Sequence, residues 1–223
     1  MPISYPFKTI FVHIPKCAGT SVEKYLGMGS AAQLFSYKPI KLTNIKYDKN
    51  LFTLNELKDF EERTPQHLTV SQIKKIIPED TFNSFFKFSI IRHPYQRMIS
   101  EYAYIHETPT QKTAKFRNKP FATFVDEVLA LSESDKLTLF DGHLEHQKNY
   151  LYENDTLCVD VVYKLEDFEP CIVKLKEITK NDRDLPHSRA TTFTDIEEEL
   201  SLDVKQKIYD YYLDDFLAFG YTK

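Results

Sequence analysis

Residues 9–26 read TIFVHIPKCAGTSVEKYL, and this stretch decides the fold class. Residues 9–14 are mainly apolar and rich in β-branched side chains, which predicts a buried strand. A helix is predicted from residue 21, so the loop HIPKCAGTS (13–21) joins the end of a strand to the start of a helix. The first turn of a helix offers unpaired N–H groups to an anion, and glycine lets the backbone approach it closely. Because a lysine and two hydroxyl side chains add further donors, we predict that this loop binds a phosphate.

The rest of the chain alternates strand-like and helix-like segments. Strands are predicted at residues 85–91 and 157–163, which are rich in apolar and β-branched side chains. Helices are predicted at residues 55–63, 69–77, 94–107, 120–131 and 168–179, and two closing helices follow with Thr194 and Ser201 as caps. This alternation favours a single α/β domain over residues 1–223 with a largely parallel sheet.

The composition excludes several classes of function. The 223-residue chain is 42% hydrophobic and carries a net charge of −4, so no general surface for nucleic acid or anionic membrane is expected. Its three cysteines have no metal-site spacing, and their odd number argues against a disulfide framework. No stretch is long enough to span a membrane, and the first residues lack the pattern of a signal peptide. We therefore predict a cytoplasmic protein.

A second segment strengthens the prediction of a phosphate site. Residues 87–102 read KFSIIRHPYQRMISEY, in which Arg92 directly follows a predicted strand and Pro94 suits the first turn of a helix. Ser100 lies about two helical turns beyond Arg92. The arginine fork and the hydroxyl can hold a second phosphate. Taken singly, the first loop could be a plain turn and Arg92 could form a surface ion pair, but the two elements together favour phosphate binding.

The loop differs from the nucleoside triphosphatase motif GxxxxGK[ST], because its lysine precedes the glycine. It resembles instead the 5′-phosphosulfate loop of sulfotransferases that use 3′-phosphoadenylyl sulfate (PAPS), which reads HIPKTGGTS in the closest branch. Residues 87–102 resemble the 3′-phosphate element of the same class, usually written with RNPYDR. That branch is the carbohydrate-type family that includes heparan sulfate 2-O-sulfotransferase. The similarity continues through HLEHQKNYLY (143–152), VDVVYKLEDFE (159–169), LPHSR (185–189) and YDYYLDDFLAFGY (209–221).

This resemblance implies a sulfotransferase fold with three α/β/α layers around a central, mostly parallel sheet, related to that of nucleotide kinases. It also implies a role for each matching residue. Lys16 would contact the bridging region of the phosphosulfate and stabilise the leaving 3′,5′-bisphosphate product, PAP. Arg92 and Ser100 would bind the 3′-phosphate, and the loop around Ser188 and Arg189 would close over the cofactor. The 5′-phosphate would be held by backbone and hydroxyl groups of Cys17, Ala18, Gly19, Thr20 and Ser21. The acceptor would be a hydroxyl group of a carbohydrate or glycoconjugate, and no metal is expected.

A base must take the proton of the acceptor hydroxyl, and histidine suits this role near neutral pH. The family places its catalytic histidine in the stretch that reads TPQHLTVSQ here (64–72), so we predict that His67 is the base. A histidine just before a helix, taken by itself, is more often an exposed cap or loop residue, and the family match turns the interpretation toward a base. His143, His146 and Glu101 are alternative bases, although the segment around the two histidines is more suited to shaping the acceptor site.

The loop departs from the family pattern at two positions, and a pair of aspartates near the end of the chain has an interpretation of its own. Cys17 and Ala18 replace the usual Thr-Gly, and Ala18 has less backbone freedom than glycine. Next to Lys16 and a helix start, Cys17 is a candidate for a lowered thiol pKa, although sulfuryl transfer needs no cysteine. Asp214 and Asp215 are interpreted as part of a solvated helix face.

Two other functions stay open at this point. A nucleotide kinase-like phosphotransferase would require Mg-ATP, and the missing GK[ST] argues against it. A non-catalytic module that binds PAP or an adenine nucleotide would keep Arg92 and Ser100 but transfer nothing. Specificity for the acceptor is expected to lie in residues 31–66 and 107–149.

Overall fold

The computed structural model describes residues 3–28, 51, 53, 64–108, 110–185 and 200–223. At the centre of this part lies a four-stranded sheet in the order β1-β2-β3-β6. Its strands are Ile3–Ser4, Thr9–Val12, Phe86–Ile91 and Val161–Lys164. Strands β2, β3 and β6 run parallel, and β1 pairs with β2 antiparallel. The predicted α/β fold with a mostly parallel central sheet is confirmed.

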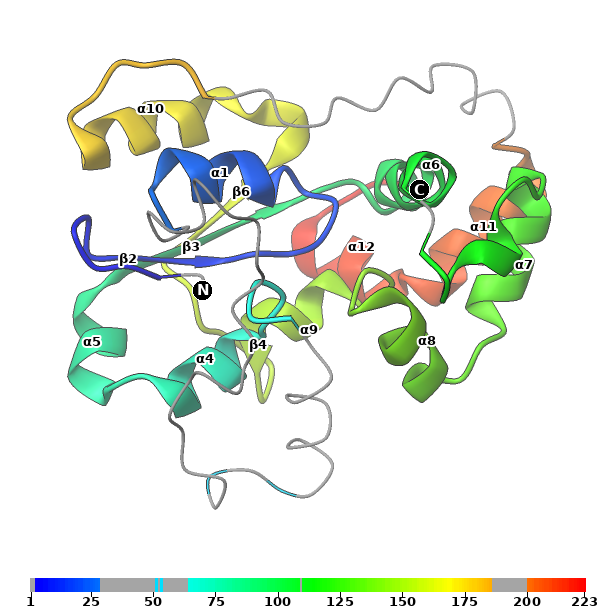
Figure 1. Cartoon of the computed structure of the whole chain (residues 1–223), viewed down its shortest axis with the longest axis horizontal. Helices are drawn as coiled ribbons and strands as arrows, with labels where there is room; N and C mark the ends of the chain where they lie inside the picture. The colour runs from blue at the N-terminus through cyan, green and yellow to red at the C-terminus, as the bar shows by residue number, and fades with distance from the viewer. Residues whose placement is uncertain (1–2, 29–50, 52, 54–63, 109, 186–199) are drawn as a thin grey trace.

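Helices cover both faces of this sheet. α1 (Gly19–Tyr25) and α10 (Glu169–Thr179) lie on one side, and α4 (Val70–Ile76) and α5 (Glu79–Ser84) lie on the other (Figure 1). Inside, Phe11 of β2 and Phe88 of β3 occupy partner positions, with ring centroids 5.0 Å apart. Both side chains are fully buried, as expected for strands covered on both faces.

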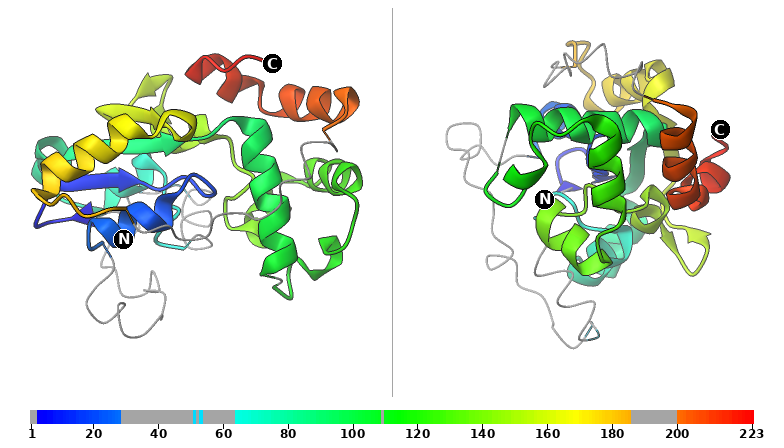
Figure 2. Two further views of the ribbon diagram at one scale, coloured as in Figure 1. Left: turned by 90° about the horizontal axis from the view of Figure 1, so that it is seen from above. Right: turned by 90° about the vertical axis from the view of Figure 1, so that its right-hand side faces the viewer.

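A second group of helices extends from the end of β3. α6 (Pro94–Glu107) leads away from the sheet to α7 (Phe121–Leu129) and α8 (Glu133–Phe140), and α11 (Leu202–Tyr211) and α12 (Leu213–Phe219) pack beside them (Figures 1 and 2). These helices share an apolar cluster of their own around Phe121, Phe124 and Ile208.

Local sequence signals fix several helix starts as predicted. Thr69 accepts a hydrogen bond from the Gln72 N–H, and the Gln72 side chain accepts one from the Thr69 N–H, which is the reciprocal cap of a helix start. The Ser201 side chain caps α11 by accepting from the Val204 N–H. α6 begins at Pro94 and ends at Glu107, as the sequence predicts. The predicted helix at 55–63 and the predicted cap Thr194 lie outside the described residues.

The predicted strand at 157–163 is wrong in its first half. Thr156–Leu157 (β5) pairs instead with Tyr152–Glu153 (β4) in a separate antiparallel hairpin that follows α9 (Gln147–Leu151). The chain joins the central sheet only at Val161. Asp160 explains the break, because its carboxylate accepts a hydrogen bond from the Lys87 N–H at 2.7 Å and so fixes the entry into β6.

Asp215 also differs from its prediction, because it is fully buried and not part of a solvated face. Its two carboxylate oxygens accept hydrogen bonds from the N–H groups of Gln147 and Lys148, each at 2.9 Å. A carboxylate there satisfies the unpaired donors at the start of α9.

Within the described residues, no helix combines the length and the apolar character that crossing a bilayer requires.

Candidate functional site

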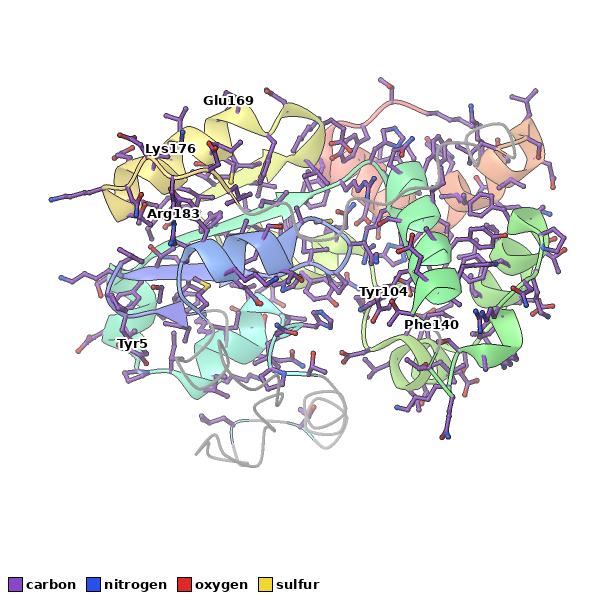
Figure 3. All side chains as sticks on the ribbon, turned by 45° about the horizontal axis from the view of Figure 1, so that its top comes forward. Tyr5, Tyr104, Phe140, Glu169, Lys176 and Arg183 are labelled. Atoms are coloured by element: carbon purple, nitrogen blue, oxygen red, sulfur yellow. The ribbon has the colours of Figure 1, made fainter. Side chains whose placement is uncertain are left out.

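One cavity of about 1020 Å³ gathers most of the residues predicted to act on a ligand. It lies where β2 and β3 end, and Tyr104 of α6 and Phe140 of α8 line it on the side away from the sheet (Figure 3). The predicted donor-binding residues on its wall are Lys16, Ala18, Gly19, Thr20, Ser21, Arg92 and Ser100. The predicted base His67 lines the same cavity. Ser188 and Arg189 lie outside the described residues.

The loop between β2 and α1 takes a tightly turned shape that depends on one glycine. Lys16 and Ala18 both have left-handed backbones, with φ angles of 68° and 60°. At Gly19 a Cβ atom would lie 2.0 Å from Cδ2 of the His13 ring, so only glycine fits against that imidazole. The His13 ring cannot easily swing away, because its Nδ1 is 2.9 Å from the buried Glu23 carboxylate and its ring stacks on Phe11. His13 therefore fixes the position of the loop.

The side chain of Gln147 fixes the backbone of Arg92 at the cavity. The side chain of Gln147 donates to the Arg92 carbonyl at 2.8 Å and accepts from the Arg92 N–H at 2.9 Å. Arg92 Nη1 also donates to the Lys16 carbonyl at 3.4 Å, which links the two predicted phosphate-binding elements directly. Burial lowers the pKa of the guanidinium from its usual value. A partly desolvated cation next to a wall of donors suits a phosphate.

Arg97, in the first turn of α6, joins three segments under the cavity. It is 2% exposed, and its guanidinium donates to the carbonyls of Pro15, His143 and Glu145 at 3.2, 2.8 and 2.7 Å. The first carbonyl belongs to the loop before α1, and the other two belong to the segment before α9. Arg97 is therefore a structural brace between the predicted donor site and His143.

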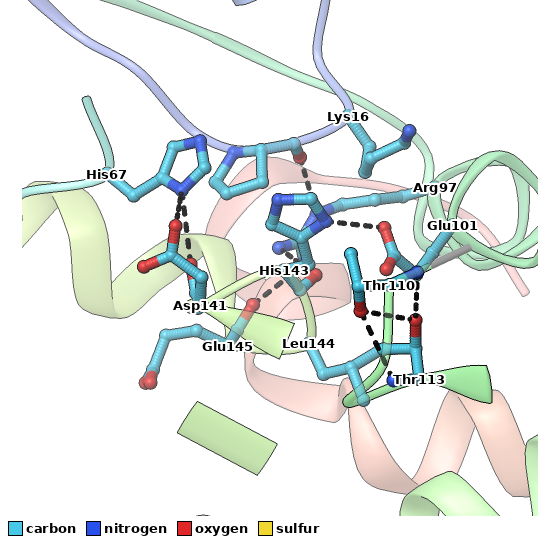
Figure 4. A network of polar contacts seen from close by, with 12 residues as sticks. Lys16, His67, Arg97, Glu101, Thr110, Thr113, Asp141, His143, Leu144 and Glu145 are labelled. Atoms are coloured by element: carbon cyan, nitrogen blue, oxygen red, sulfur yellow. Dashed lines mark hydrogen bonds and ion pairs between the residues drawn. The ribbon is translucent and has the colours of Figure 1, made fainter. Parts of the chain in front are cut away.

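A carboxylate backs His67 at the cavity wall. His67 Nδ1 lies 2.9 Å from Asp141 Oδ2, and the other oxygen of Asp141 accepts from the Thr64 N–H at 2.8 Å (Figure 4). The burial of Asp141 would raise its pKa, but its bond to His67 lowers the pKa below the usual value. An ionised Asp141 keeps the proton of a neutral imidazole on Nδ1, so Nε2 is the nitrogen that can accept another proton.

Two further histidines continue this arrangement. The His13 ring lies edge-on to His67 with centroids 5.2 Å apart, and His143 lies on the other side of His67 at 5.1 Å. Like His67, each has a carboxylate at Nδ1: Glu23 at 2.9 Å for His13 and Glu101 at 2.7 Å for His143. All three rings line the cavity. Despite this row, no group of His, Cys, Asp or Glu side chains in the described ranges is arranged to hold a metal ion.

Cys17 does not share the wall of the cavity and is 1% exposed. Its sulfur lies 3.5 Å from Gln147 Oε1. Burial raises the pKa of its thiol to about 12 and outweighs the neighbouring charges of Arg97 and Arg92. The prediction of a lowered thiol pKa is therefore wrong. It took account of the nearby positive charges but not of the burial of the side chain, which disfavours the thiolate.

Comparison with known proteins agrees with this arrangement. A family model described as "Sulfotransferase family" matches residues 3–222, nearly the whole chain. The chain belongs to the sulfotransferase family. A search of curated proteins and a search of solved structures each found no significant match. Membership of the family makes the chain an enzyme that transfers sulfate, and it leaves the acceptor and the individual residue roles to be argued from the site.

Sequence reasoning missed several residues that support this sulfotransferase site. Asp141 lies in no recognised motif, and Gln147 lies in HLEHQKNYLY but was given no role of its own. Arg97 is the last residue of RHPYQR, a segment that drew attention only to Arg92. His93 stands where the resemblance expects asparagine, and it still caps α6 by accepting from the Tyr95 N–H at 3.3 Å. The arginine that closes the family's RNPYDR element at the same position was the available signal for Arg97.

Gly19→Ala is expected to destabilise the sulfotransferase by about 1–3 kcal/mol, because the new methyl group must displace the His13 ring. Urea unfolding measures this directly. Ala18→Gly is the matched control on the neighbouring residue. Because Ala18 has a φ of 60°, glycine there is expected to leave stability unchanged or raise it by up to about 1 kcal/mol. Equal stability of Gly19→Ala and the parent protein would contradict the role assigned to His13.

Proposed function

We propose that this sulfotransferase moves the sulfuryl group of PAPS to a hydroxyl group of a carbohydrate or glycoconjugate. The observation that carries the proposal is the meeting of two predicted phosphate-binding elements with a carboxylate-backed histidine on one cavity. At about 1020 Å³ the cavity exceeds the usual ~300–1,000 Å³ of small-ligand sites, so it has room for a donor and an acceptor. A single domain over residues 1–223 and a cytoplasmic location stay predictions.

The residues on the cavity wall fit the charges of PAPS. The loop from Lys16 to Ser21 would hold the 5′-phosphosulfate through its backbone N–H groups and hydroxyls, with Cys17 contributing only its backbone. Arg92 and Ser100 would bind the 3′-phosphate, since both lie on the same wall and Ser100 is one of the buried polar residues there. We include Ser188 and Arg189 in the donor site on the resemblance alone.

The chemistry requires positioning and charge stabilisation more than bond-forming side chains. The donor supplies an activated sulfuryl group. His67 Nε2 takes the proton of the acceptor hydroxyl while its Nδ1–H stays bonded to Asp141. Lys16 stabilises the negative charge that develops on the phosphate as the sulfur–oxygen bond breaks.

The acceptor side of the cavity suits a neutral, hydroxyl-rich molecule. Its wall carries the aromatic ring of Tyr104 and four threonines: Thr108, Thr110, Thr113 and Thr138. Aromatic faces and convergent hydroxyls are suited to binding small polar ligands such as sugars. The resemblance to the carbohydrate-type branch supports the same acceptor class.

Calorimetric titration with PAP and with ATP, each with and without Mg²⁺, tests the donor assignment. We expect PAP to bind without Mg²⁺ and Arg92→Ala to weaken that binding about 10- to 100-fold, the contribution of one or two hydrogen bonds from a charged group. Arg117→Ala, which removes an exposed arginine outside the cavity, is the matched control and is expected to bind normally. A preference for Mg-ATP would favour the kinase-like alternative, and PAP binding without any transfer would favour the non-catalytic module.

A further inference from the structure

We propose that His67 and His143 together bind two neighbouring hydroxyl groups of the acceptor, so that the preferred acceptor is a diol. This inference rests on the proposed function and specifies its substrate. In it, His67 takes the proton of the hydroxyl that becomes sulfated. His143 accepts a hydrogen bond from the second hydroxyl, which stays unchanged and orients the first.

His143 is prepared as a hydrogen-bond acceptor by a buried carboxylate. Its Nδ1 lies 2.7 Å from Glu101 Oε2, and Glu101 is only 2% exposed. Burial lowers the pKa of His143 despite the nearby carboxylate, so the ring is neutral at physiological pH. Burial alone would raise the pKa of Glu101, but its contact with His143, together with Lys16 and Arg97, lowers that pKa. A neutral imidazole that donates from Nδ1 to an ionised Glu101 accepts at Nε2.

The two imidazoles form one composite site. Their centroids are 5.1 Å apart, with the ring planes at 73°. Figure 4 shows His67 joined to Asp141 at the left and His143 joined to Glu101 on its right. Beyond His143, the Tyr104 ring lies 5.5 Å away and carries Lys16 Nζ 4.0 Å above its face. His143 therefore contacts both the predicted base and the tyrosine that carries Lys16, the lysine that would contact the phosphosulfate.

Proton transfer alone does not account for the second imidazole. One base is enough to remove one proton. Burying the Glu101 carboxylate costs desolvation free energy, which its contact with His143 offsets. Two imidazoles whose centroids lie 5.1 Å apart offer two acceptor nitrogens for two O–H donors. Hydroxyls on adjacent carbon atoms can reach both rings, because a hydrogen bond from a hydroxyl spans about 2.8 Å. A site built to bind a particular hydroxyl discriminates strongly against an analogue that lacks it.

The transfer step balances without any further reactant. The O–H bond of the first hydroxyl breaks, its proton goes to His67 Nε2, and its electron pair forms the new oxygen–sulfur bond. The bond between sulfur and the bridging oxygen breaks, and PAP leaves with that electron pair. His143 and the second hydroxyl keep their hydrogen bond throughout.

Transfer from PAPS to trans-1,2-cyclohexanediol, compared with transfer to cyclohexanol, tests the proposal. We expect kcat/KM to be about tenfold higher for the diol, the effect of one good hydrogen bond. His143→Ala is expected to bring that ratio close to one, and Glu101→Gln is expected to lower it in part. His146→Ala is the control, because that ring packs on Tyr211 and Tyr212 and does not line the cavity. PAP binding by each variant checks that it is folded.

A spectroscopic measurement separates this proposal from the proposed function. With PAP bound, the diol is expected to shift the Nε2 signals of both His67 and His143 in nitrogen NMR spectra, and cyclohexanol only one of them. Equal transfer to both alcohols, or an unchanged ratio in His143→Ala, overturns the diol proposal and leaves sulfuryl transfer intact. If PAP does not bind and no alcohol is sulfated, the proposed function fails and the diol proposal fails with it.

Discussion

His67→Ala is expected to lower kcat for sulfuryl transfer by about 10²- to 10⁴-fold, the usual contribution of a positioned general base. The imidazole is held by Asp141 at 2.9 Å and by the Asp141 carbonyl at 3.1 Å, so its ring does not have to be oriented during the reaction. His13 and His143 also have a carboxylate at Nδ1, but neither ring occupies the position of His67, since their centroids lie 5.2 and 5.1 Å from that of His67. The measurement is the rate of PAP release with the fastest acceptor of an alcohol panel.

Two comparisons show whether the loss is one of proton transfer. Affinity for PAP is expected to stay within about twofold in His67→Ala, because the residue acts on the acceptor and an unchanged Kd with a lower kcat identifies an effect on the transition state. Asp141→Asn is expected to give a smaller loss, since the ring remains but the charge that fixes its Nδ1–H is removed. Normal turnover in His67→Ala together with none in His143→Ala would transfer the role of base to His143.

The fold was predictable where its signals are local. The start of α6 follows from Pro94 in its first turn, and the start of α4 follows from Thr69 and Gln72, which are three positions apart. The limits of β6 were not predictable, because residues 157–163 are uniformly apolar apart from Asp160, whose partner Lys87 lies 73 positions away. Burial of Asp215 was missed for the same reason, because its partners are the N–H groups of another helix.

The residues of the site also fall into two groups: those that belong to local motifs, and those whose partners are distant in sequence. Lys16, Arg92 and Ser100 belong to contiguous motifs, so their meeting at one cavity could be predicted from two strand ends. The pairs that orient the chemistry are distant in sequence: 74 positions separate His67 from Asp141, and 42 separate His143 from Glu101. A single sequence holds no record of which carboxylate meets which imidazole. That information arises only when α6 and the segment before α4 both pack against the segment after α8.

Lys16→Ala is expected to lower kcat by about 10²- to 10³-fold, the usual loss when one stabilising donor is removed from a transition-state charge. Lys16 has a φ of 68°, which turns the loop so that its side chain reaches the cavity beside Tyr104. Its ammonium influences Glu101 and His143, which places the charge close to the acceptor side of the site.

Comparing kcat with PAP affinity tests whether Lys16 acts on the leaving group or merely on binding. A lysine that bound donor and transition state equally would raise Kd and KM when removed and leave kcat unchanged. Negative charge on the bridging oxygen develops only as its bond to sulfur breaks. We therefore expect removal of Lys16 to lower mainly kcat and to weaken PAP binding only a few-fold. Lys24→Ala is the control, since Lys24 is exposed on the adjoining helix α1 and does not line the cavity. A loss confined to PAP affinity would make Lys16 a donor-binding residue and leave the leaving group to be stabilised by the loop N–H groups and Arg92.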